Sequence, residues 1–145
     1  MFIGIVDDLN DHIYQAVRKL VPQLGAHKVI PTYDELKSLV ISDASSLLVA
    51  RFPDKDSAVV GILTISIYRV PTGVRSIVED VIVDRSVRRR GIARALLDEA
   101  IAIARRAGAN GVALTSNLQR VEANLLYQSI GFTKRETNSY FYKLM

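Results

Sequence analysis

Five arginines and one aspartate lie within residues 84–94, "DRSVRRRGIAR", directly before the helix-forming run "ALLDEAIAIA". A helix N-terminus carries a partial positive charge, so each cation near it costs about 0.3–1 kcal/mol. The free backbone N–H groups at that end bind anions, and a glycine lets a phosphate approach the backbone. A bound phosphate would make the arginines its counter-charges. The segment therefore predicts an anion site, and a solvated run of arginines is the alternative.

The distribution of charge favours a local site over a broad basic face. The 145-residue chain has a net charge of +4. Residues 84–94 hold five of the 19 basic residues and one of the 15 acidic residues, so the rest of the chain is balanced at 14 of each. The excess positive charge is therefore confined to one segment. The P-loop and Rossmann glycine patterns are both missing, which argues against those two kinds of phosphate site.

Composition excludes several other classes of function. The chain has no cysteine, so disulfides, thiolate metal sites and acyl-cysteine chemistry are excluded. Two histidines without metal-binding spacing are too few for a histidine metal site, and we expect no metal. The first residues do not resemble a signal peptide, and the apolar stretch at residues 58–68 is too short to cross a bilayer. We expect a cytoplasmic protein without a membrane partner.

Hydrophobic periodicity predicts a mixed α/β fold in one domain over residues 1–145. Strands are expected at residues 2–6, 45–52, 59–70, 75–84, 111–116 and 139–145, and helices at residues 9–24, 31–42, 87–107 and 120–130. Thr32 and Glu35 have the spacing of a capping box at the start of the second helix. This order of elements predicts a single sheet covered by helices.

Two stretches of the chain together resemble one protein family. Residues 77–97, "IVEDVIVDRSVRRRGIARALL", resemble the acyl-CoA signature of the GNAT superfamily of N-acetyltransferases, which is a strand, then [Q/R]-x-x-G-x-[G/A], then a helix. Arg88, Gly91 and Ala93 stand at its three defined positions. Residues 120–132, "RVEANLLYQSIGF", resemble the later helix of that family, written A-x-x-L/F-Y-x-x-x-G-F.

The resemblance covers the whole chain and implies both a fold and an activity. The implied fold is a single GNAT-like domain with a mixed sheet of about six to seven strands and about four flanking helices, in which a splayed strand pair forms the acyl-CoA slot. The implied activity is direct transfer of an acetyl group from acetyl-CoA to a primary amine in a ternary complex. The acceptor, a small molecule or a protein amine, is not readable, and a homodimer is possible.

The resemblance also assigns cofactor-binding residues. The pyrophosphate of acetyl-CoA is expected on the loop and first helical turn, that is, on Arg88, Arg89, Arg90, Gly91, Ile92, Ala93 and Arg94. The pantetheine is expected to pair with the backbone of the preceding strand at Val81, Ile82 and Val83, like an added strand. Many family members have an asparagine near the cofactor where this chain has Arg120, so Asn117 is a second candidate for that contact.

Two catalytic residues follow from the same resemblance. Tyr127 matches the family's usual general acid for the CoA sulfur; a core tyrosine is the alternative. Glu79 is the candidate base, since on a regular strand it would share a face with Val81 and Val83 and be sunk beside them in the slot. Alternatively, Glu79 only binds the substrate ammonium or pairs with an arginine. Asp80 would face the other way, and the amide of Val81 would meet the oxyanion.

Two other functions stay open at this stage. One is a GNAT-like domain that binds acyl-CoA without catalysis. The other is a basic nucleic-acid-binding module, although the arginine segment has no aromatic residues within it for base stacking. Steep salt-dependent binding to random DNA would identify this last class.

Overall fold

The structure is a computed structural model that describes all 145 residues, in two units, Met1–Thr115 and Ser116–Met145. The elements of the first unit are β1 (Phe2–Ile5), α1 (Asp11–Leu24), α2 (Tyr33–Val40), β2 (Ser45–Arg51), β3 (Val59–Val70), β4 (Gly73–Val83), a 3₁₀ turn η1 (Arg85–Val87) and α3 (Ile92–Arg106). The second unit contains α4 (Val121–Ile130).

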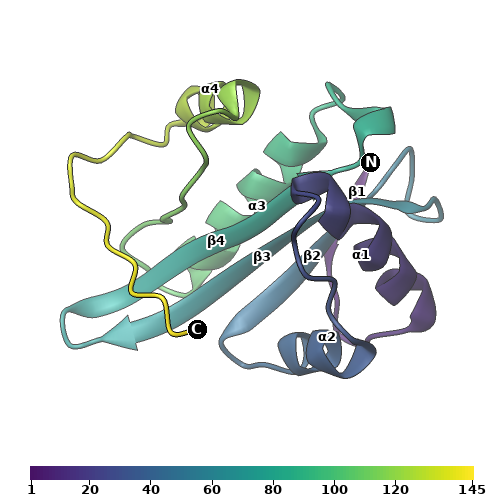
Figure 1. Cartoon of the computed structure of the whole chain (residues 1–145), viewed down its shortest axis with the longest axis horizontal. Coiled ribbons are helices and arrows are strands. Elements are labelled where there is room, and N and C mark those ends of the chain that lie inside the picture. The colour runs from purple at the N-terminus through teal and green to yellow at the C-terminus, as the bar shows by residue number, and fades with distance from the viewer. The chain divides into compact units, whose positions relative to one another are not determined.

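The sheet has four antiparallel strands in the order β1-β2-β3-β4, so that each strand lies beside its neighbour in the chain (Figure 1). β3 and β4 form a long hairpin that closes where Val70 pairs with Gly73. Beyond β4, one parallel bridge joins Ile77 to Ala113. β4 is therefore the strand through which the sheet reaches the segment that follows α3.

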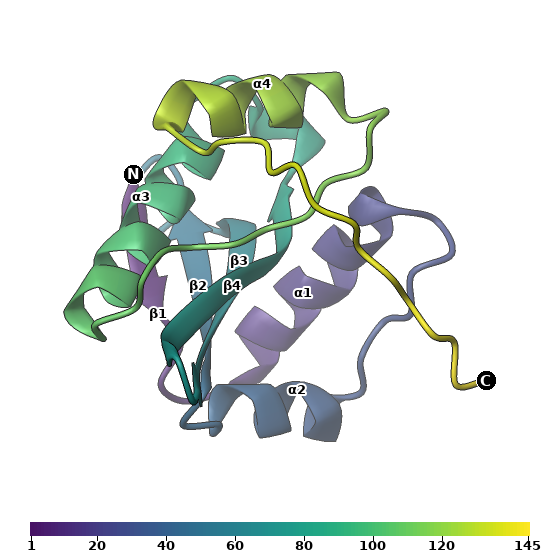
Figure 2. The same cartoon turned by 90° about the vertical axis from the view of Figure 1, so that its left-hand side faces the viewer.

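Helices cover both faces of this sheet (Figure 2). α1 and α2 lie on one face, where Val17 and Leu20 of α1 belong to the same buried cluster as Ile62 and Ile82 of the sheet. α3 lies on the other face. A Cβ atom on Gly61 would stand 3.2 Å from Ile92 and 3.3 Å from Leu96, so the start of α3 packs directly on β3. None of the helices has the length and apolarity needed to span a membrane.

The expectation of six to seven strands is wrong, because the sheet has four. Residues 111–116 contribute only the single bridge at Ala113. Residues 139–145 form no strand, and Tyr140, Phe141 and Tyr142 are almost fully exposed. An alternating pattern shows that a segment could form a strand, but the strand exists only where a neighbouring backbone pairs with it.

Two further expectations, the four helices and the capping box, are confirmed, and the start of the third helix is shifted. Four helices form, and the capping box of α2 is present: Thr32 Oγ1 accepts the Glu35 N–H at 3.1 Å and Glu35 Oε1 accepts the Thr32 N–H at 2.9 Å. The helix expected from residue 87 begins at Ile92. Arg89 and Gly91 have φ angles of 62° and 77°, and a left-handed backbone interrupts a right-handed helix.

Candidate active site

The N-terminus of α3 is open and has no side-chain cap. Gly91 is the N-cap in a left-handed conformation, and it provides no side-chain capping hydrogen bond. The first N–H with a helical partner is that of Ala95, which donates to the Gly91 carbonyl at 3.0 Å. A Cβ atom on Gly91 would meet nothing within 4 Å, so the space beside the backbone is free. Amides in this arrangement form a concave donor site that suits a phosphate.

The arginines around this helix end face solvent. Arg88, Arg90 and Arg94 are exposed, and no acidic residue lies in the first turn of α3. The Arg90 guanidinium stands 6.0 Å from the centre of the Phe52 ring, a cation–π contact. Positive side chains, the positive end of the helix and free amides thus coincide, which is the donor set that a pyrophosphate requires.

A β-bulge interrupts β4 just before this loop. Thr64 of β3 pairs with Glu79, but Ile62 pairs with Ile82, so Asp80 and Val81 together oppose one β3 residue. Asp80 has a positive φ of 51°, which accommodates the extra residue of β4 at the bulge. Such a bulge bends the strand and interrupts regular pairing.

The bulge coincides with the end of the contact between β4 and the segment after α3. Asn110 N–H donates to the Val74 carbonyl, Ala113 N–H to the Ser76 carbonyl, and Val78 N–H to the Ala113 carbonyl, at 3.0, 3.0 and 2.9 Å. Within Met1–Thr115 this series ends at Val78. Beyond the bulge, Ile82 and Val83 pair with β3 on one edge of the strand, which leaves the other edge of residues 81–83 available for an added extended chain.

The bulge also changes the face on which Glu79 lies. Residues paired across two antiparallel strands share a face, and so do residues two apart on a regular strand. Glu79, opposite Thr64, therefore shares the α1 face with Ile82, opposite Ile62. Val83, opposite Gly61, lies on the α3 face. The prediction that Glu79 shares a face with Val83 is wrong because it assumed unbroken alternation.

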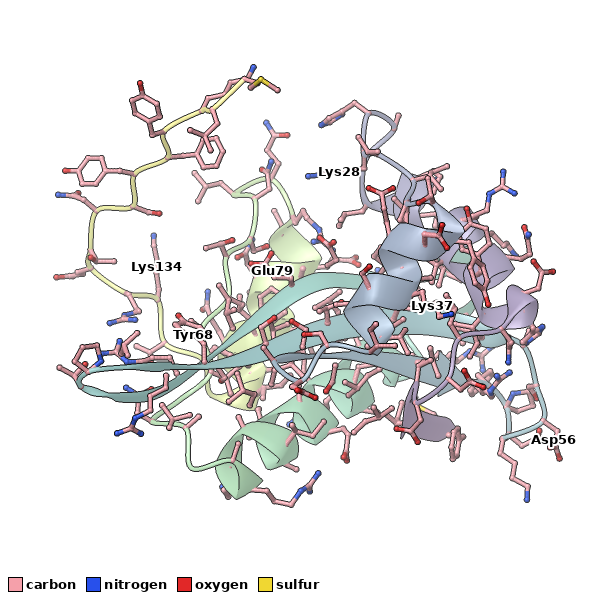
Figure 3. All side chains as sticks on the ribbon, turned by 90° about the horizontal axis from the view of Figure 1, so that it is seen from below. Lys28, Lys37, Asp56, Tyr68, Glu79 and Lys134 are labelled. Atoms are coloured by element: carbon pink, nitrogen blue, oxygen red, sulfur yellow. The ribbon has the colours of Figure 1, made fainter.

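Glu79 is exposed rather than sunk in the sheet, so the expected burial beside Val81 is also wrong. Figure 3 shows it on the side of the sheet away from α3. Val81 and Val83 are half-buried and Ile82 is buried. The structure thus brings residues 79–83 and 88–94 together as one continuous strand, loop and helix start.

Sequence reasoning missed the carboxylate of Asp84, which is buried with an exposed fraction of 6%. Its Oδ1 accepts the backbone N–H and the hydroxyl of Ser86, both at 3.0 Å, and its Oδ2 lies 3.2 Å from Lys19 Nζ. The bond from the Ser86 backbone, helped by the Ser86 hydroxyl and by Lys19, lowers the Asp84 pKa against the opposing effect of burial. The available signal was an aspartate two residues before a serine, a common turn pattern.

α4, in the second unit, holds the other candidate residues. Tyr127 is buried with an exposed fraction of 7%, and its ring meets the Phe132 ring edge-on at 6.0 Å. Burial raises the Tyr127 pKa, and the charge of Arg120 acts in the opposite direction. With a pKa above the ordinary value of 10.0, the hydroxyl is protonated at neutral pH, as a general acid must be.

Asn117 and Arg120 organise the start of α4. The Asn117 side chain accepts the Gln119 N–H at 2.9 Å, and the carbonyl groups of Asn117 and Arg120 accept the Asn124 side-chain amide at 3.0 and 2.8 Å. These bonds give both residues a local structural role. The contact of either residue with a cofactor stays a prediction.

Comparison with known proteins gives one family. The sequence profile of the Acetyltransferase (GNAT) family matches residues 13–132. No curated protein is significantly similar to the chain in sequence.

Many solved structures share the fold at low sequence identity. An aminoglycoside acetyltransferase, meta-AAC0020 from an uncultured soil metagenomic sample, superposes with a TM-score of 0.83 and 20% identity over 99% of this chain and 95% of its own. AAC(6')-Iy, solved with a bisubstrate CoA analogue, gives 0.76 and 19% over both whole chains. A transcriptional regulator from Bacillus halodurans C-125 gives 0.79 and 21% over 98% of this chain and all of its own. At such identities the likeness establishes the fold alone.

Proposed function

The chain belongs to the GNAT acetyltransferase family, and on this premise we propose that it transfers an acetyl group from acetyl-CoA to a primary amine, directly and in a ternary complex. The observation that carries the proposal is the open N-terminus of α3. Its uncapped amides, the left-handed Gly91 and the exposed arginines together form a site whose stability improves when an anion binds.

Acetyl-CoA fits the residues that surround this helix end. The amides of Gly91, Ile92 and Ala93 and the side chains of Arg88 and Arg94 would hold its pyrophosphate. The unpaired edge of residues 81–83 would hold its pantetheine through backbone hydrogen bonds. When bound, acetyl-CoA supplies the acetyl group as an activated thioester.

Three groups of this chain would then act on protons and charge. Glu79 would bind the ammonium of the acceptor and remove its proton, directly or through water, because an alkyl amine with a pKa of about 10.4 is almost fully protonated at neutral pH. The amide of Val81, at the bulge, would donate a hydrogen bond to the oxyanion. Tyr127 would give its proton to the departing thiolate, and its burial in α4 supports that role.

The sheet face around Glu79 indicates the charge of the acceptor. Toward the β3–β4 hairpin the α1 face carries Thr64, Ser66 and Tyr68 of β3 and Arg75 of β4, and Ser66 bonds to the Ser45 hydroxyl at 2.7 Å. Among the β3 and β4 residues that pair across this face, Glu79 supplies the only carboxylate. One carboxylate beside hydroxyls and an arginine suits an acceptor with one ammonium and a polar remainder, whereas a polycation would be repelled by Arg75.

The test combines binding with turnover. Free acetyl-CoA at about 100 times its Kd should stabilise the protein by about 2.7 kcal/mol, measured as a thermal shift. On a panel of primary amines, Glu79→Gln should lose most of the activity near pH 7 and recover part of it at high pH, where the amine deprotonates by itself. Asp80→Asn, the matched control in the bulge, should keep the wild-type pH profile.

Each contrary result has a definite meaning. No thermal shift with millimolar acetyl-CoA would contradict the proposal as a whole. A shift without acetylation of any amine would favour a non-catalytic acyl-CoA-binding domain. A Glu79→Gln variant that keeps the pH profile and only raises the acceptor KM would make Glu79 a binding residue.

A further inference from the structure

The buried carboxylate of Asp84 has no part in the chemistry proposed above, yet it stands at the junction of β4 and the arginine loop (residues 85–91). Its backbone N–H donates to the Val60 carbonyl of β3 at 2.7 Å, and its own carbonyl accepts the Val87 N–H at 3.1 Å. With the two bonds from Ser86 to its side chain, Asp84 is tied both to the sheet and to the first turn of the loop.

A second set of contacts ties the same place to α1. Lys19 Nζ lies 3.2 Å from Asp84 Oδ2, and Gln23 Oε1 accepts the Arg85 N–H at 3.0 Å. Lys19 and Gln23 are four residues apart and therefore stand on one face of the helix. α1 thus contacts two successive residues, Asp84 and Arg85, at the start of the arginine loop.

These contacts with α1 oppose the charge repulsion that would otherwise disorder the arginine loop. The loop and the first turn of α3 place the exposed Arg88, Arg90 and Arg94 at the positive end of a helix, where they repel one another and the helix dipole. Asp84 is the only acidic residue within residues 84–94. A loop that is already ordered binds its ligand more tightly, because the ordering entropy is not lost on binding.

From these contacts, and resting on the proposed function, we infer that Asp84 is a positioning residue for cofactor binding. Together with Lys19 and Gln23 of α1, it holds the arginine loop in its phosphate-binding conformation before the ligand arrives. Asp84 acts through the Ser86 and Arg85 backbone and does not itself touch the cofactor, since a carboxylate beside a phosphate would repel it.

The test measures binding of coenzyme A by calorimetry and hydrogen exchange of the free protein. In Asp84→Ala the Kd for coenzyme A should rise about tenfold, as expected when charge-assisted hydrogen bonds are lost. Amides of residues 85–94 should exchange faster while those of β3 keep their protection. Asp84→Asn keeps an acceptor for the Ser86 N–H, so its Kd should rise by less than about threefold.

Two exposed lysines, one that contacts Asp84 and one that does not, show whether the contact itself or only the net charge of the protein affects binding. Lys19→Met and Gln23→Ala should each weaken coenzyme A binding about two- to threefold. Lys37→Met, an exposed lysine on α2 (Figure 3), should leave it unchanged. If Asp84→Ala fails to fold, the Kd of Gln23→Ala tests the inference instead, because the Gln23 side chain contacts the loop from α1, outside the sheet.

The outcomes distinguish this inference from the proposed function. A wild-type protein that does not bind coenzyme A would contradict the proposed function. A wild-type protein that binds, with unchanged Kd in Asp84→Ala and Gln23→Ala, would contradict the inference alone. A lower melting temperature of Asp84→Ala without a change in Kd would make Asp84 a residue of stability only.

Discussion

The two ends of α3 contain the same residue types, a glycine and arginines, but the arginines interact with the helix dipole in opposite senses. Gly91 precedes the helix and Gly108 follows it, both with a φ of 77° and both with open space where a Cβ atom would stand. Arginines stand at both ends. At the C-terminus, Arg105 and Arg106 lie in the last turn, where a positive charge stabilises the helix dipole.

The C-terminal end satisfies its backbone groups, and the N-terminal end does not. Gly108 N–H donates to the Arg105 carbonyl at 3.1 Å and Ala109 N–H to the Ala104 carbonyl at 3.0 Å, which closes the helix in a Schellman motif. At the other end the first-turn amides have no side-chain cap, and the arginines oppose the dipole. The sign of the charge–dipole interaction therefore distinguishes the arginines that stabilise the helix from the arginines that we propose bind the cofactor.

The largest predicted effect concerns the proposed chemistry, which involves residues outside α3. Tyr127→Phe should lower kcat about 10²–10⁴-fold, the usual contribution of a positioned general acid. The Kd for acetyl-CoA should stay within a few-fold of wild type, because the ring keeps its packing against Phe132. Single-turnover rates and calorimetry would measure the two effects. Unchanged turnover, with chemistry rate-limiting, would make Tyr127 a core residue.

The second prediction compares the replacement of each of the two glycines by glutamate. Gly91→Glu puts a side chain and a negative charge where phosphate should bind, so the Kd for acetyl-CoA should rise at least about 100-fold, the loss of roughly two charge-assisted hydrogen bonds. Gly108→Glu suffers the same backbone strain, of about 1–2 kcal/mol, and should keep its affinity. Equal affinities in the two variants would contradict the anion site.

The third prediction compares the replacement of the arginine pair at each end of α3 by glutamine. Replacing Arg88 and Arg94 by glutamine should weaken acetyl-CoA binding about tenfold and reduce its salt dependence. Stability should hold or rise slightly, since the dipole is relieved. Replacing Arg105 and Arg106 by glutamine should cost about 0.3–1 kcal/mol of unfolding free energy per residue and leave binding unchanged. Denaturant titrations and calorimetry would show whether the two pairs differ in this way.

The smallest predicted effect applies the same reasoning to the β3–β4 hairpin. Arg75 lies on the α1 face with Glu79, and Arg69, opposite Val74, lies on the α3 face. A charge about 10 Å away is worth about 0.4 kcal/mol in water, so reversing it in Arg75→Glu should favour a diamine over a matched monoamine about fourfold. Arg69→Glu should not change this ratio. A polyamine preferred by the wild type would contradict the single-charge acceptor.

Local features of this chain were predictable. The capping box at Thr32 and Glu35 is confirmed, and so are the helices expected at residues 9–24 and 120–130. These features depend on residues within one or two turns of each other, which the sequence displays directly.

The features that failed depend on pairing between distant segments. The face of Glu79 changed because one extra residue at Asp80 shifts the alternation, and a bulge is visible only once β3 and β4 are in register. The number of strands fell because residues 139–145 have no partner strand.

By itself the sequence determined the order of the elements and the arginine-rich helix start, together with the family to which they belong, since these follow from short-range spacing. Only the tertiary structure decided that Glu79 lies on the α1 face and that Lys19 reaches Asp84 across the fold. The physical reason is that sheet register and the burial of a charge are properties of contacts between segments, and those contacts exist only after the chain has folded.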